Sequence, residues 1–152
     1  MSIRKALERD IPVLIQIVIE YKKEQNLLFD LNQIEKVRKS LMNSIRSEEN
    51  TLIVSIDTEK NTIDGFINFH ILDFPLILGK ELYISDLVLK KDTRGKGRGT
   101  SLLTYVEKIA NNQGCTRIML NNLKDSEAYK REFYYKKGFI ERKNIANYVK
   151  HL

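Results

Sequence analysis

The spacing of apolar residues in the first third of the chain predicts a short strand followed by two helices. Residues 2 to 6 alternate weakly between polar and apolar positions, as in a strand with one buried face. Asp10 is the expected N-cap of a helix that opens the apolar run 11 to 19, with Pro12 in its first turn. A second helix is predicted near residues 32 to 46, where four apolar residues share one face: Ile34, Val37, Leu41 and Ile45.

The apolar period changes after residue 50 and predicts three successive strands. Segments 51 to 57 and 62 to 72 are rich in β-branched and aromatic residues, and the polar loop 58 to 61 joins them as a hairpin. Segment 74 to 80 contains proline and glycine and is expected to be a loop. A further strand over 81 to 89 follows it.

The last third of the chain returns to helical spacing and then ends in extended pieces. Gly114 and Gly138 are placed to end two helices in a left-handed conformation, and Asp125 or Ser126 is expected to begin the second of them. The predicted elements are a helix over 100 to 113, a strand over 116 to 121, a helix over 126 to 137, and extended segments over 139 to 141 and 146 to 150. This order predicts one α+β domain spanning 1–152, with a mixed, mostly antiparallel sheet flanked by helices.

Composition narrows the class of protein. The contents of 42% hydrophobic and 30% charged residues are ordinary for a globular domain, and the longest apolar run is too short to cross a bilayer. No signal-peptide pattern opens the chain, so a cytoplasmic protein without membrane attachment is expected. One cysteine and two histidines offer neither a disulfide framework nor a zinc site.

The basic residues are concentrated in the segment Arg94-Gly95-Lys96-Gly97-Arg98-Gly99, although the net charge of +6 alone names no anionic partner. A strand, a tight glycine turn and an amphipathic helix form a binding site for a pyrophosphate, because glycines let the backbone approach and the helix N-terminus presents free N–H groups. The arginines and the lysine add charge and donors. A solvated basic turn is the plain alternative.

Two other phosphate-binding motifs fit this turn poorly. A nucleotide P-loop needs a lysine directly before its Ser or Thr, and none precedes Thr100. The dinucleotide fingerprint needs a third glycine at position 100 and an acidic residue about twenty positions on, where Asn121 and Asn122 stand.

The pattern that remains is Arg/Gln-x-x-Gly-x-Gly/Ala, and a second signature, Phe-Tyr-x-Lys-x-Gly-Phe, lies downstream over residues 133 to 139. With both motifs in this order, the chain resembles the GNAT superfamily of acetyl-CoA-dependent N-acetyltransferases. The opening Ile3-Arg4-x-Ala6 followed by Asp10 also resembles the first strand and helix of that family. The resemblance implies a three-layer α/β/α fold around the mixed sheet, with acetyl-CoA (coenzyme A) as the cofactor.

The resemblance also implies the site residues. Tyr134 matches the family tyrosine that protonates the coenzyme A sulfur, and Asp86 matches an acidic strand residue that draws the amine's proton through water or positions the amine. Glu81 and Tyr83 are reserves for that role. Cys115 is expected to be a buried, inert thiol. The residues implied to contact the cofactor are Leu87, Val88, Leu89, Arg94, Gly95, Lys96, Gly97, Arg98, Gly99, Thr100, Asn122, Ser126 and Lys130.

The acceptor is expected to be a small-molecule amine such as a polyamine, amino acid, aminoglycoside or aminoalkylphosphonate. In the family the N-terminal helices and the loop 73 to 80 line its site, where five carboxylates could receive a cation: Glu20, Glu24, Asp30, Asp73 and Asp86. Three alternatives stay open: an acetyltransferase for protein lysines or N-termini, a non-enzymatic acyl-CoA sensor, and a nucleic-acid-binding domain using the basic turn. We expect no nucleic-acid partner, and a homodimer stays open.

Overall fold

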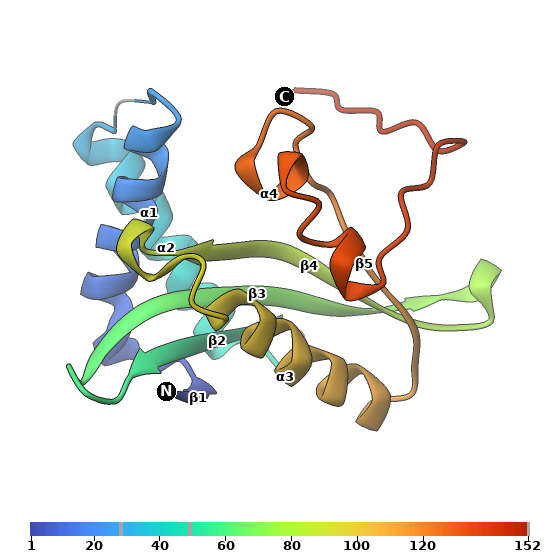
Figure 1. Cartoon of the computed structure of the whole chain (residues 1–152), viewed down its shortest axis with the longest axis horizontal. Helices are drawn as coiled ribbons and strands as arrows, with labels where there is room; N and C mark the ends of the chain where they lie inside the picture. Colours follow the sequence, from blue (N-terminus) through green and yellow to red (C-terminus); the bar gives the residue numbers. More distant parts are fainter. Residues whose placement is uncertain (28, 49, 152) are drawn as a thin grey trace. The chain divides into compact units, whose positions relative to one another are not determined.

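A five-stranded sheet organises the first 120 residues of the chain (Figure 1). The computed structural model describes residues 1–27, 29–48 and 50–151, and the chain divides into two compact units, 1–120 and 121–152. The elements of the first unit are β1 (Ser2–Lys5), η1 (Glu8–Asp10), α1 (Ile11–Glu24), α2 (Leu31–Arg46), β2 (Asn50–Asp57), β3 (Thr62–Phe74), η2 (Pro75–Ile77), β4 (Gly79–Leu89), η3 (Lys91–Thr93), α3 (Arg98–Asn112) and β5 (Cys115–Leu120).

The strands follow the order β1-β2-β3-β4-β5 across the sheet. The pairings β1–β2, β2–β3 and β3–β4 are antiparallel, and β4–β5 is parallel. The parallel connection runs through α3, as a crossover between parallel strands requires. The predicted mixed, mostly antiparallel sheet is therefore confirmed, and no helix in the described ranges is long and apolar enough to span a membrane.

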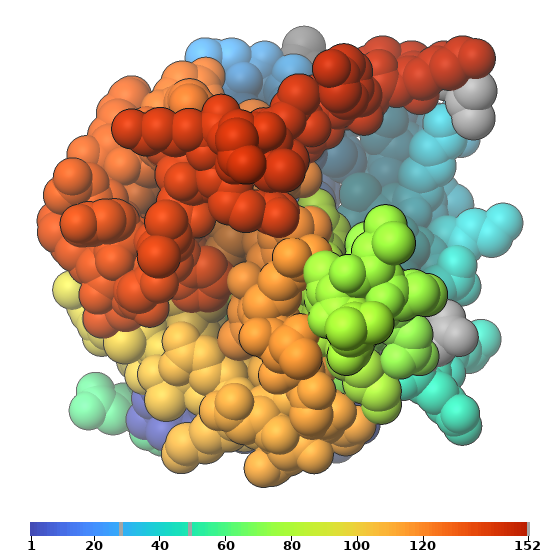
Figure 2. All heavy atoms as spheres, turned by 90° about the vertical axis from the view of Figure 1, so that its right-hand side faces the viewer, coloured from blue at the N-terminus to red at the C-terminus, as the bar shows by residue number. Residues whose placement is uncertain are grey.

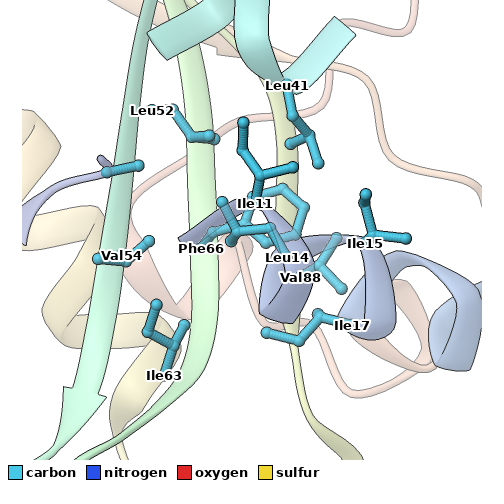
Figure 3. Packing of buried hydrophobic residues seen from close by; sticks show 11 residues of the cluster. Ile11, Leu14, Ile15, Ile17, Leu41, Leu52, Val54, Ile63, Phe66 and Val88 are labelled. Atoms are coloured by element: carbon cyan, nitrogen blue, oxygen red, sulfur yellow. The ribbon is translucent and has the colours of Figure 1, made fainter. Parts of the chain in front are cut away.

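Helices cover both faces of this sheet. In Figure 1, α3 passes in front of the sheet and α2 lies behind it. Figure 3 shows the cluster on the face of α1 and α2, where Leu14, Ile17 and Phe66 are almost fully buried. On the other face, Leu102 and Val106 of α3 have no exposed surface. Burial of one such side chain stabilises the fold by roughly 1.5–3 kcal/mol, so the apolar periodicity explains both helical layers.

Asp10 precedes α1 but does not cap it as predicted. Its side chain accepts no hydrogen bond from the helix, because the carboxylate already binds Arg4 at 2.7 and 3.0 Å and the Leu7 amide at 2.8 Å. Through these contacts Asp10 links the turn between β1 and α1 to Arg4 of the first strand. The second helix does have a capping box, in which Asp30 and Gln33 exchange hydrogen bonds.

The predicted loop over 74 to 80 is shorter in the structure, because β3 continues to Phe74 and β4 begins at Gly79. A single 3-10 turn closes this hairpin and leaves Leu76 and Leu78 more than nine-tenths exposed. The hairpin end, light green in Figure 2, and residues 113 and 114 directly after α3 line an open hollow.

The second unit differs most from the sequence prediction. The single helix expected over 126 to 137 is wrong: α4 covers Glu127–Lys130, and η4 covers Tyr135–Lys137 after a break. At the break Glu132 is left-handed (φ 57°), and the Phe133 amide donates to the Ala128 carbonyl, outside the helical pattern. Segments 139–141 and 146–150 are not strands, since the sheet pairs only β1 to β5 in the described chain. Gly138 is left-handed as predicted (φ 84°).

Candidate active site

Strands β4 and β5 separate halfway along β4. Their parallel ladder ends where Ile84 pairs with Leu120, and no β5 residue in the described chain pairs with β4 over residues 85–89. The other edge of β4 stays paired with β3 as far as Leu89. Residues 85–89 therefore turn alternate backbone N–H and C=O groups toward a side that β5 does not occupy, which is the arrangement that accepts an extended ligand as an added strand.

A β-bulge in β4 lies where the two strands separate. Asn68 pairs with Asp86 while the next β3 residue, Phe69, pairs with Ile84, so Ser85 has no partner opposite it. Because of the extra residue, side chains two positions apart on either side of the bulge lie on opposite faces of the sheet. Ile84 packs on the α3 face, whereas Asp86 lies on the face of α1 and α2 together with Val88.

The glycine-rich turn after β4 has the backbone conformation that its glycines permit. Gly95 and Gly97 have φ values of 76° and 79°, and a Cβ at either position would meet nothing within 4 Å. Helix α3 begins at Arg98, two residues before the predicted start, and its first intrahelical hydrogen bond runs from the Ser101 amide to the Gly97 carbonyl. The amides before Ser101 thus have no acceptor within the helix, and the space in front of the turn is open.

Arg94 is engaged with the protein itself. Its guanidinium donates twice to the Leu89 carbonyl, at 3.1 and 2.9 Å, and pairs with Glu24 at 2.6 Å. Arg94 therefore joins the end of β4 to the last residue of α1, and Glu24, which was expected to receive an acceptor cation, is neutralised by this contact.

Arg98 is directed into the sheet. It pairs with Asp57 at 3.1 Å and with Asp64 at 3.0 Å, the latter without hydrogen-bond alignment. Ser55 donates to the other oxygen of Asp64, which is 2% exposed. Hydrogen bonds from the Lys60 and Glu59 amides, helped by the charge of Arg98, hold the pKa of Asp57 below its usual value despite desolvation.

Asp64 also anchors the turn through its backbone. Its carbonyl accepts hydrogen bonds from the Lys90 amide at 2.9 Å and the Thr93 hydroxyl at 3.3 Å. One residue of β3 thus fixes the start of the turn through its carbonyl and the start of α3 through its carboxylate. Lys96 is exposed and has no ion pair among the described residues, so it is the cation of the turn that is free for an external anion.

Asp86 is exposed at the bulge, where the Ser85 hydroxyl donates to its carboxylate at 2.8 Å. The Asn68 side chain lies across from it, and its buried Oδ1 has no hydrogen-bond partner in the described chain. Acceptor oxygens therefore gather at the bulge, and such a group attracts a hydrogen-bond donor such as an ammonium.

The other acidic and nucleophilic candidates differ in their surroundings. Glu81 is fully buried and pairs with Arg117 of β5, so its charge is already balanced. Burial raises the pKa of the Cys115 thiol and outweighs the opposing charge of Lys80. That thiol is poorly suited to a covalent acyl intermediate.

Within the second unit, two of the implied cofactor residues contact each other. Ser126 caps α4 by accepting from the Tyr129 amide, and its hydroxyl donates to Asn122 at 3.0 Å. Lys130 is exposed and pairs with Glu127. The Tyr134 ring packs edge-on against Phe133 and Phe139, with centroids 5.0 and 5.7 Å away, so the Phe-Tyr-x-Lys-x-Gly-Phe signature folds into one aromatic cluster.

Sequence reasoning missed Asp57, Asp64 and Asn68 as parts of the site. Asp57 and Asp64 lie beside the turn only because the hairpin of β2 and β3 brings them there, and Asn68 acquires its place from the bulge opposite. No spacing in the sequence marks these residues.

Comparison with solved structures supports this fold. The chain is similar to a probable acetyltransferase over 100% of this chain and 98% of that one, with 20% identity and a TM-score of 0.83. An aminoglycoside acetyltransferase from an uncultured soil metagenomic sample, in complex with sisomicin, has 18% identity and a TM-score of 0.76, covering 99% and 95% of the two chains. A ribosomal-protein-alanine N-acetyltransferase from Brucella melitensis biovar Abortus 2308 has 14% identity and a TM-score of 0.76, covering 100% of both.

The family comparison is more specific than these likenesses. Among curated proteins no match was found. The model of the acetyltransferase (GNAT) family, however, matches residues 14–139, which include the β4 bulge, the glycine turn and the aromatic signature. The expected resemblance is thereby confirmed, and the chain belongs to the acetyltransferase (GNAT) family of acyltransferase enzymes.

Proposed function

We infer that this enzyme transfers an acetyl group from acetyl-CoA to the primary amine of a small molecule by direct attack. The observation that carries the inference is the separation of β4 from β5 directly before a glycine turn and a helix N-terminus. An extended arm with amide groups can pair along β4, and a pyrophosphate can lie on the amides of the turn. Members of this family generally use acetyl-CoA, which has both parts.

Different residues would hold the different parts of this cofactor. Leu87, Val88 and Leu89 would hold its pantetheine arm through the backbone, because the Val88 side chain is committed to the core. The backbone of residues 95–100 and the Lys96 ammonium would hold the pyrophosphate. Arg94 and Arg98 would contribute by fixing the turn, since both guanidiniums are paired with carboxylates of the protein. Asn122, Ser126 and Lys130 remain proposed contacts.

The chemistry assigns roles to two further side chains. Acetyl-CoA supplies a thioester carbonyl that an uncharged amine can attack. Asp86, beside the buried Oδ1 of Asn68, would anchor the ammonium and position its nitrogen. Tyr134 would give a proton to the departing thiolate.

The molecule that receives the acetyl group is proposed to be small and cationic, because oxygens that accept hydrogen bonds gather at the bulge. Solved structures of similar fold include enzymes named for aminoglycosides and for a ribosomal protein, so protein acceptors form the contrasting outcome of the test.

Titration calorimetry with acetyl-CoA, ATP and NAD tests the cofactor site. Gly97→Glu should abolish acetyl-CoA binding by placing a negative side chain in front of the turn. Gly114→Glu is a matched control, because Gly114 is also left-handed (φ 69°) with open space around its Cβ position. Binding of ATP or NAD but not acetyl-CoA, or equal affinities of the two variants, would contradict the proposal.

An amine library screened for release of free thiol tests the acceptor. Turnover of small diamines or amino sugars is the expected result. Acetylation of intact proteins with no small amine consumed would instead assign a protein acceptor.

A further inference from the structure

A half-buried histidine lies on the same sheet face as the proposed amine anchor. His70 of β3 is two positions from Asn68, so both side chains point to the face of α1 and α2. Same-face neighbours on a strand are about 7 Å apart, and Asn68 lies directly across from Asp86. An imidazole is therefore within reach of an amine held at the bulge.

The imidazole is held by a partner on the neighbouring strand. Its Nδ1 is hydrogen-bonded to the side-chain Oδ1 of Asn50 in β2, which lies opposite it in the ladder. An amide oxygen only accepts, so Nδ1 carries a proton in this contact, and the lone pair of an uncharged ring would then lie on Nε2. Throughout the described chain, Nε2 has no hydrogen-bond partner from the protein.

The other side of the ring faces β4. Tyr83 lies opposite His70 in the ladder, with ring centroids 6.4 Å apart and planes tilted by 31°. The remaining titratable groups on this face of β4 are Glu81, which pairs with Arg117, and Asp86 beyond the bulge. A row of polar side chains therefore crosses three strands, formed by Asn50, His70 and Tyr83, and the pair of Asn68 and Asp86 lies next to it along the strands.

We propose that His70 is a catalytic base of this enzyme, acting through Nε2 on the acceptor amine. The inference rests on the proposed function and assigns Asp86 the anchoring role alone. A histidine changes protonation near neutral pH and accepts a proton there far better than a carboxylate does.

The proton and bond changes balance in this assignment. The ammonium gives one proton to Nε2, and its nitrogen then forms the C–N bond to the thioester carbonyl carbon. The C–S bond breaks with its electron pair on sulfur, and the thiolate takes the second nitrogen proton by way of Tyr134 or water. His70 returns its proton to solvent, so the products are the amide, the free thiol and one proton.

The test is the pH dependence of kcat/KM for an amine that the wild-type enzyme acetylates. His70→Gln should lower kcat/KM by about a hundredfold or more and remove the wild-type acid limb, while acetyl-CoA affinity stays unchanged. Asn50→Asp keeps the contact to Nδ1 but adds a negative charge that favours the imidazolium. The acid limb should then move to higher pH by about one unit. His151→Gln, at an exposed position, is the matched control and should change neither quantity.

The outcomes separate this inference from the proposed function. Amine turnover by the wild type with an unaltered acid limb in both His70→Gln and Asn50→Asp would overturn the role of His70 alone. A structural role would lower activity equally across pH. Absence of both acetyl-CoA binding and amine turnover in the wild type would overturn the proposed function and this inference with it.

Discussion

Replacement of Arg98 by methionine should separate the structural role of this residue from a direct phosphate contact. Methionine retains an unbranched apolar stem but removes the charge that faces Asp57 and Asp64. Asp64 is 2% exposed and would keep only Ser55 as a side-chain partner, so its carboxylate would remain buried without a cation. The sequence alone suggests a phosphate ligand, whereas the geometry predicts a loss of stability.

The size of the effect follows from burial. Breaking a buried ion pair from one side costs about 3–5 kcal/mol, and we expect the lower end, about 3 kcal/mol, because water still reaches Arg98. The exposed fraction of the Arg98 side chain is 16%. With an m-value of about 2 kcal/mol/M, the urea midpoint should fall by about 1.5 M.

Equilibrium urea unfolding and acetyl-CoA titration measure the two quantities. Asp64→Asn introduced into Arg98→Met should recover more than half of the lost stability, because the amide still accepts from Ser55 and leaves no charge unpaired. Lys96→Met, at an exposed position of the same turn, should leave stability within about 0.5 kcal/mol and weaken acetyl-CoA binding by about tenfold. Full stability of Arg98→Met with loss of acetyl-CoA binding would refute this reasoning.

Three further predictions follow from other parts of the structure. Asp10→Asn should cost about 1–2 kcal/mol at pH 7, since Arg4 is partly exposed. Burial raises the pKa of Asp10, but hydrogen bonds from Arg4 and Leu7 outweigh it and leave the pKa lowered. This stability is therefore present above the ordinary aspartate pKa and is lost below about pH 4, so acid unfolding should be less steep in Asp10→Asn. Gly65→Ala should cost about 1–3 kcal/mol in urea unfolding, because its Cβ would lie 2.7 Å from the Val88 carbonyl and against the Leu89 side chain; unchanged stability of Gly65→Ala would contradict this packing. Tyr134→Phe should keep acetyl-CoA affinity and lower kcat by about a hundredfold; an unchanged kcat and pH profile would remove Tyr134 from the mechanism.

Elements with one buried face could be predicted from the sequence. The helical spacing of Leu102, Leu103 and Val106 predicts α3, and Gly97 and Gly114 bound it with left-handed backbones. The hairpin of β2 and β3 and the basic glycine turn were predictable for the same reason, because local apolar period and glycine placement decide them.

The family resemblance implies a bulge in β4, but the apolar pattern of the strand does not place it, because β4 buries apolar side chains on both faces. Leu82 and Ile84 face α3, whereas Val88 faces α1 and α2, yet all three occupy even positions in an apolar run. The polar pair Ser85-Asp86 lies between them, but alternation alone does not show that one of these two residues is extra. The ion-pair partners of Arg98 could not be predicted either. They lie up to 41 residues away in sequence, and only the register of the sheet brings them to Arg98. The break in the helix of the second unit was not predicted, because the apolar periodicity of residues 126–137 gives no sign that Glu132 has a left-handed backbone.

The separation of β4 from β5 also bears on how this protein behaves in concentrated solution. Backbone groups of residues 85–89 that are not paired to β5 resemble the edge of an open sheet, which can add a strand from another chain and so begin aggregation. Two exposed polar residues, Ser85 and Asp86, stand where such a strand would enter and oppose an apolar partner. A small molecule that pairs along this edge would protect the protein from self-association as well as take part in its reaction, and the unfolding temperature would rise with the logarithm of its concentration above the dissociation constant.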